Sequence, residues 1–135
     1  MTTTTKTLYR AAKDDSVIGA CSFAARKSDA RAYLDNGAFG GPNLYRARVE
    51  IDPGKVLDLT GERDGLARVA EIVGFDGGAI GVDEWIMHGP VSEALIAAGY
   101  LWVRLIDSFP EGCETWTWLG ASSLDADEPE LESVS

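Results

Sequence analysis

The sequence predicts a small α+β domain, with about six short strands and about three or four short helices around one core. Two patterns lead to this class: apolar residues that alternate with polar ones, and apolar residues at helical spacing. Glycine and proline separate the two kinds of segment. The chain has 135 residues, 45% of them hydrophobic, which is enough for one domain with a buried core.

The strands are predicted from period-two alternation. The clearest runs from 44 to 51, where every second residue is apolar and the residues between are Arg46, Arg48 and Glu50. This pattern indicates one buried and one charged face. Shorter strands are expected at 7–11, 21–24, 56–59, 100–106 and 115–119. In the last of these, Trp116 and Trp118 share one face.

The helices are predicted from their ends as much as from their apolar faces. One begins near Ser28, a good N-cap, and another runs from about residue 61 to a stop at Gly74. A third lies between Pro90 and Gly99. The glycine-rich stretch from 75 to 87 has no clear assignment.

The charge of the chain limits its partners. There are 22 acidic and 12 basic residues, a net charge of -10, which disfavours direct binding to nucleic acid. The same charge either simply keeps the protein soluble, as is common for acidic proteins, or suits a basic protein partner. Part of the acid lies in a tail with few apolar residues, and residues 1–6 and 122–135 are expected to be disordered, with the domain spanning 7–121.

Most catalytic signatures are missing. One histidine, His88, and two distant cysteines, Cys21 and Cys113, give no metal-ligand spacing, so no metal is expected and both cysteines are expected to be reduced. The glycines fit neither a dinucleotide fingerprint nor a P-loop. No apolar stretch is long enough to span a bilayer, and a soluble, cytoplasmic protein is expected.

Polar residues on separate predicted strands remain as candidates for chemistry. Arg10, Ser22 and Glu114 come from three strands. An arginine can hold a pyrophosphate, and a hydroxyl can brace a carboxylate. A carboxylate can stabilise the positive charge that develops when nicotinamide leaves NAD. An aromatic side chain, Phe23 or Tyr33, can pack against the nicotinamide.

These segments resemble the ADP-ribosyltransferase superfamily. The segment 19–24, Gly-Ala-Cys-Ser-Phe-Ala, followed by 28–34, is similar to the family's second motif. The segments 44–51 and 56–59 resemble the strands that follow, and 97–100 with 114–118 resemble the closing part. The resemblance covers about residues 7–121 and implies split β-sheets around an NAD cleft.

The resemblance also implies roles for single residues. Glu114 takes the catalytic role, and NAD as substrate is held by Tyr9, Arg10, Ser22, Phe23, Ala24 and Tyr33. Families that modify arginine carry an acid where this chain has Gly112, so arginine is a doubtful acceptor. Small phage-encoded anti-CRISPR members have a similar length and acidity, and by their pattern Asp107 is a second catalytic candidate.

Two functions from different classes follow. The first is NAD-dependent mono-ADP-ribosylation of a protein acceptor by a bacterial or phage effector, such as a toxin or an anti-CRISPR protein. The second is a non-enzymatic acidic inhibitor that occupies the basic nucleic-acid-binding surface of a partner. A fold of this type that has lost its activity and only binds a partner is a third possibility.

Overall fold

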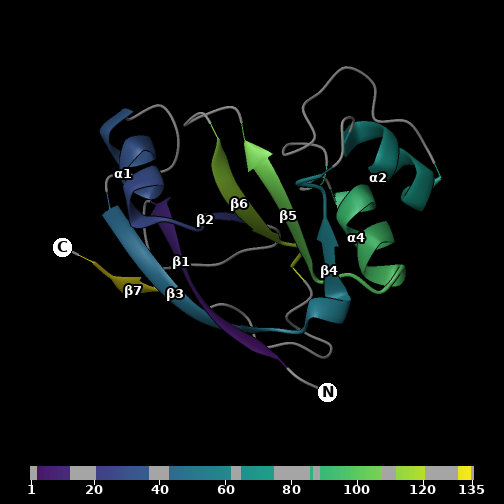
Figure 1. Ribbon diagram of the computed structural model, residues 1–135, viewed down its shortest axis with the longest axis horizontal. Coiled ribbons are helices and arrows are strands. Elements are labelled where there is room, and N and C mark those ends of the chain that lie inside the picture. The colour runs from purple at the N-terminus through teal and green to yellow at the C-terminus, as the bar shows by residue number, and fades with distance from the viewer. Residues whose placement is uncertain are drawn as a thin grey trace.

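The computed structural model describes residues 3–12, 21–36, 43–61, 65–74, 86, 89–107, 112–120 and 131–134 (Figure 1). The strands are β1 Thr4–Ala12, β2 Cys21–Ala24, β3 Asn43–Ile51, β4 Val56–Asp58, β5 Trp102–Asp107, β6 Cys113–Trp118 and β7 Glu132–Ser133. The helices are α1 Lys27–Asn36, α2 Gly65–Val73 and α4 Gly89–Ala97, with a 3₁₀ turn, η1, at Pro53–Lys55. The α+β class is confirmed.

All seven of these strands join one mixed sheet in the order β4-β5-β6-β2-β1-β3-β7. The described strands therefore form one continuously hydrogen-bonded sheet, in place of the split β-sheets that the resemblance implied. Only β4 and β5 run parallel, and every other pair of these strands is antiparallel. Strand β3, predicted for 44–51, begins one residue earlier and pairs along its whole length with β1.

One face of the sheet, called the inner face here, carries the largest buried side chains. Phe23, Trp102 and Trp118 are almost fully buried, and their rings meet edge-on or tilted, with centroids 6.0 Å apart for Phe23–Trp102 and 5.3 Å for Trp102–Trp118. Val49 of β3 belongs to the same cluster, although β3 lies four places from β5 in the sheet. The sheet therefore bends around this cluster.

The opposite, outer face is covered by the helices (Figure 1). Helix α1 packs near β1, β2 and β3, where Ala24, Ala30 and Leu44 form a small buried cluster. At the other end, α2 and α4 lie over β4 and β5, and a second buried cluster includes Val69, Leu95, Val103 and Leu105. No described helix has the length and apolarity needed to cross a bilayer.

The two ends of the chain differ from the expectation of disorder. Residues 4–6 belong to β1, since the β-branched threonines suit a strand and pair with the end of β3, from Thr4 opposite Ile51 onward. Glu132–Ser133 form β7 on the other edge of β3. On the two flanks of β7, Leu131 packs against the inner-face cluster and Val134 against the outer-face cluster. These contacts anchor this part of the acidic tail. Residues 121–130 lie outside the described residues.

Local side-chain chemistry forms the turn after β3. The Asp52 carboxylate accepts a hydrogen bond from the Gly54 amide at 2.9 Å and caps η1. Helix α1 begins at Lys27, one residue before the predicted start. Helix α2 is described from Gly65, and residues 62–64 of its predicted range lie outside the described residues. Neither cysteine is in a disulfide, as expected, and the two lie in clusters on opposite faces of the sheet.

The end of α4 requires a left-handed residue, and we expect Gly99→Ala to be destabilising. Gly99 has φ of +103°, and the amide of Tyr100 bonds back to the Leu95 carbonyl at 3.1 Å. A Cβ at 99 meets nothing within 4 Å, so the cost is backbone strain alone, about 1 kcal/mol. Urea unfolding measures it. Gly89→Ala, also with open space but without a positive φ, is the control and is expected to keep or raise stability.

Candidate functional site

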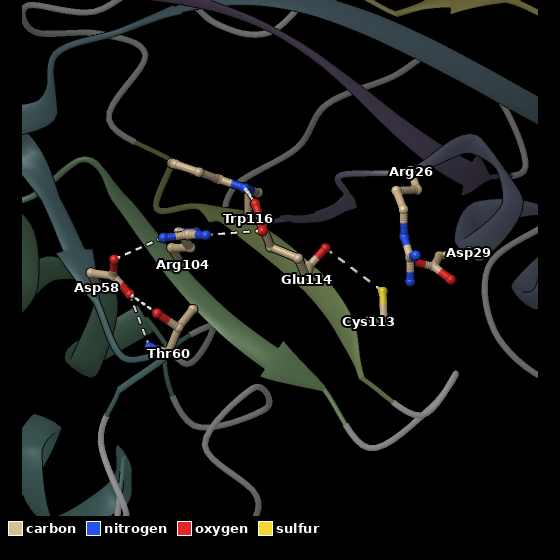
Figure 2. A network of polar contacts seen from close by, with 8 residues as sticks. All are labelled: Arg26, Asp29, Asp58, Thr60, Arg104, Cys113, Glu114 and Trp116. Atoms are coloured by element: carbon tan, nitrogen blue, oxygen red, sulfur yellow. Dashed lines mark hydrogen bonds and ion pairs between the residues drawn. The ribbon is translucent and has the colours of Figure 1, made fainter.

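The inner face carries a row of charges at its β4–β5–β6 end (Figure 2). Arg104 lies between two carboxylates: its Nη1 donates to Asp58 Oδ2 at 2.9 Å and its Nη2 to Glu114 Oε1 at 3.0 Å. The Trp116 indole Nε1 donates to the other Glu114 oxygen at 2.7 Å. Both oxygens of Glu114 are therefore engaged. We call Asp58, Arg104, Glu114 and Trp116 the charged row.

The strand registers place these residues side by side. Asp58 is opposite Arg104 in the parallel β4–β5 pair, and Arg104 is opposite Trp116 in the antiparallel β5–β6 pair. Residues directly opposite one another share a face of the sheet. Glu114 follows on the same face of β6, two residues before Trp116 and diagonal to Arg104. The row thus ties the short edge strand β4 to the centre of the sheet.

Each end of the charged row has a further partner. Asp58 Oδ1 accepts from the Thr60 amide at 2.9 Å and from the Thr60 hydroxyl at 2.6 Å, an Asx-type turn just after β4. At the other end, Lys6 Nζ of β1 lies 5.0 Å from the centroid of the Trp116 ring, and Arg104 Cζ lies 5.7 Å from it. Cations at such distances are attracted by the indole face.

The charged row favours its ionised form. The Arg104 guanidinium, and next the Trp116 donor, hold the pKa of Glu114 below its ordinary value, against the opposing effect of burial. The hydrogen bond from the Thr60 hydroxyl is the largest cause that lowers the pKa of Asp58, and Arg104 adds to it. The bond to Glu114 raises the pKa of Arg104. At neutral pH the row is thus two carboxylates around one guanidinium.

Stability is expected to fall in acid because of these two carboxylates. Their folded pKa values lie below the ordinary 4.5 and 3.8, so the stability they contribute is present above those values and is lost as pH falls through the folded ones. Urea unfolding at steps from pH 6 to pH 2.5 measures this. Glu114→Gln, which keeps the shape and removes the titration, is expected to flatten the profile; an unchanged slope would contradict the assignment.

The residues expected to hold NAD divide between the two faces. Arg10, two residues after the inner-face Leu8, lies on the inner face, and its Nη1 donates to the Ser22 carbonyl at 2.9 Å. Phe23 is also on the inner face but is 1% exposed and packs edge-on against Trp102. Glu114 joins them there.

The other candidates do not share that face. The Ser22 hydroxyl lies 2.9 Å from the Thr117 hydroxyl on the outer face, so Ser22 and Glu114 point to opposite sides of the sheet. Tyr9 and Ala24 pack in the outer cluster beside α1. Asp107 ends β5 opposite Cys113, and Tyr33 lies in α1; the side chains of Asp107 and Tyr33 are outside the described residues, as are His88 and residues 75–85.

Arg104 and Asp58 were not among the predicted site residues. The sequence does contain a signal for Arg104, since a single charged residue interrupts the apolar run 101–106. A buried run tolerates a charge when a partner neutralises it. The Nε atoms of Arg104 and Arg10 are both buried and have no hydrogen-bond partner among the described residues. Within those residues there is also no group of three potential metal ligands, so nothing there suggests a metal centre.

Comparison with known proteins adds a fold likeness. No family model and no curated protein matches the chain. A solved structure, described as the crystal structure of an anti-CRISPR protein, is similar over 96% of both chains, with a TM-score of 0.52 and 14% sequence identity. Identity this low shows a shared fold alone. Nothing in these comparisons supports membership of the ADP-ribosyltransferase superfamily.

Proposed function

We propose that this protein is an inhibitor of the anti-CRISPR kind that acts by binding a partner protein. The support for the biological role is the fold likeness to an anti-CRISPR protein along almost the whole of both chains. CRISPR effectors hold their nucleic acids in positively charged channels. The partner surface we propose is such a channel, which an acidic protein is suited to occupy.

The arrangement of Glu114 and Ser22 is the observation that favours binding over catalysis. In a transferase site the carboxylate has to face the nicotinamide ribose and is braced by a hydroxyl. Here Arg104 and Trp116 orient Glu114 through one hydrogen bond to each of its oxygens, and the Ser22 hydroxyl, bonded on the other face of the sheet, does not brace it. Arg104, which is shared with Asp58, also offsets part of the Glu114 charge that would stabilise the developing cation.

The distribution of charge supports the same mode. Among the charged side chains that the structure describes, basic residues slightly outnumber acidic ones. The acidic ones are Asp29, Glu50, Asp52, Asp58, Glu71, Glu93, Glu114 and Glu132; the basic ones are Lys6, Arg10, Arg26, Lys27, Arg31, Arg46, Arg48, Lys55, Arg68 and Arg104. The net charge of -10 therefore arises from the rest of the sequence, mostly its connecting segments and tail.

A competition experiment tests the proposal. A guide-loaded CRISPR effector is mixed with labelled target DNA, and the protein is added over a salt series. We expect DNA binding to be lost at stoichiometric amounts of inhibitor without NAD, and the inhibition to weaken as salt screens the contact. Full inhibition by Glu114→Gln is expected, because the carboxylate performs no chemistry in this mode.

Charge variants identify the contact. Replacing Asp125, Asp127, Glu128 and Glu130 with their amides is expected to weaken inhibition at least tenfold, since these acids are close together in the sequence. The control neutralises Glu71 and Glu93, on the exposed faces of α2 and α4, and is expected to change inhibition less than the matched two-charge variant Asp127→Asn with Glu128→Gln. Inhibition that requires NAD, or that is insensitive to salt, would refute the binding mode.

ADP-ribosylation is a second candidate, favoured by one observation. Glu114, Arg10 and Phe23 share the inner face, and Glu114 has a lowered pKa, so an ionised carboxylate and an arginine lie on one side of the sheet. With NAD as substrate and a protein acceptor, transfer would release nicotinamide. Incubation with labelled NAD and the effector tests it: label on protein that Glu114→Gln abolishes supports transfer, and Asp107→Asn examines the alternative acid.

A further inference from the structure

We propose that the edge of β3 that faces away from β1, called the outer edge here, binds a second copy of this chain. The two β3 strands are antiparallel, with Val49 on the two-fold axis. The edge of β3 that faces β1 is fully paired with it, from Asn43 to Ile51. On the outer edge, β7 pairs only with Tyr45 and Arg46, and Val134 bonds to the Leu44 carbonyl. The stretch 47–51 has no partner strand among the described residues.

The hydrogen bonds to β7 establish which backbone groups lie on this edge. The Val134 amide donates to the Leu44 carbonyl at 2.9 Å, so residue 44, and by alternation 46, 48 and 50, direct their amides and carbonyls outward. Arg48 and Glu50 thus present two donors and two acceptors along the open stretch. An unpaired edge of this kind is a template for another strand.

The open stretch is complementary to itself. When two copies pair antiparallel about Val49, Arg48 of each lies opposite Glu50 of the other, and this is a hydrogen-bonded pair in the antiparallel pattern. Opposite charges facing across strands are stabilising. Both side chains are exposed on the outer face, while Val49 points into the core, so pairing needs no rearrangement of the inner cluster. A foreign strand would need the same charge order by chance.

The ends of the open stretch limit this pairing to residues 48–50. After Ile51 the chain leaves the sheet through Asp52 and η1, whose first residue is Pro53. Glu132 of β7 lies opposite Arg46, so Leu131 follows at the level of Ala47, which the partner's Ile51 therefore does not reach. Pairing over 48–50 leaves β7 in place. Because the shared strand is short, the dimer belongs to the small, transient class of interfaces.

Charge exchange tests this pairing. Arg48→Glu places two acids opposite each other twice across the axis, and Glu50→Arg does the same with two bases. The double variant with both changes restores complementarity. Sedimentation equilibrium from 10 μM to 1 mM at low salt is expected to show a monomer–dimer equilibrium for the wild type and the double variant. Each single change is expected to weaken it about tenfold.

The controls distinguish the edge from a general charge effect. Arg31→Glu makes the same charge change on the exposed surface of α1 and is expected to leave dimerisation unchanged. Circular dichroism checks that each variant is folded, since Glu50 also accepts hydrogen bonds from Thr3 and Thr5. A wild type that stays monomeric at 1 mM would overturn the proposal, as would a folded double variant that fails to recover dimerisation.

Discussion

Replacing Trp118 with alanine is expected to lower the free energy of unfolding by about 3–5 kcal/mol, the largest effect of any change considered for this protein. Trp118 is 1% exposed, lies opposite both Cys21 and Trp102 in the sheet, and stacks at a tilt on the Trp102 ring. Its removal leaves a cavity in the cluster around which the sheet bends. Guanidinium unfolding followed by circular dichroism measures the loss.

Two further variants make this expectation specific. Trp118→Phe keeps part of the ring volume and is expected to lose less than the alanine variant, which also provides a measurement if the latter does not fold. Ile106→Ala is the exposed control: Ile106 is 49% exposed, and its truncation is expected to cost about 0.5 kcal/mol or less. Similar losses for Trp118→Ala and Ile106→Ala would contradict the packing described here.

Replacing Arg104 with methionine is expected to lower the free energy of unfolding by about 1–2 kcal/mol at pH 7 and low salt. The change keeps an apolar stem against Trp116 but leaves Asp58 and Glu114 without their shared counter-charge. The side chains are 33%, 47% and 27% exposed for Arg104, Asp58 and Glu114, so water screens part of the loss. Urea unfolding measures the difference.

The variant also predicts a change in pH dependence. Without Arg104 the pKa of Glu114 and that of Asp58 rise toward or above their ordinary values. The stability difference between wild type and Arg104→Met should therefore shrink as pH falls and both carboxylates protonate. Arg68→Met, at an exposed pair with Glu71 within α2, is the control and is expected to cost about 0.5 kcal/mol or less. A constant difference down to pH 2.5 would argue against the charged row.

Local patterns predicted the regular elements well where the periodicity was strong. Strand β3 was predicted to within one residue because its alternation is strict, and α4 because Pro90 and Gly99 mark its ends. The prediction of disorder at the threonine-rich start was wrong for residues 4–6, which belong to β1. It was based on the small number of apolar residues there. Pairing with β3 supplies the ordering that composition alone does not reveal.

The candidate site was predicted less well, because a site depends on which residues share a face. Arg10, Ser22 and Glu114 were placed together from their order along the chain. Register separates Ser22 from the other two, since a shift of one residue in a strand moves a side chain to the opposite face. The roles of Tyr33 and Asp107 remain predictions, with side chains outside the described residues.

The sequence by itself determined the α+β class, the acidic balance, and the absence of metal-ligand spacing, because these follow from composition and local periodicity. Only the tertiary structure decided that Asp58, Arg104 and Glu114 form one row, and that, among the described residues, β3 pairs with β7 only at Tyr45 and Arg46 on the edge that faces away from β1. The reason is physical: both depend on strand order and register, which are set by contacts between segments far apart in the chain.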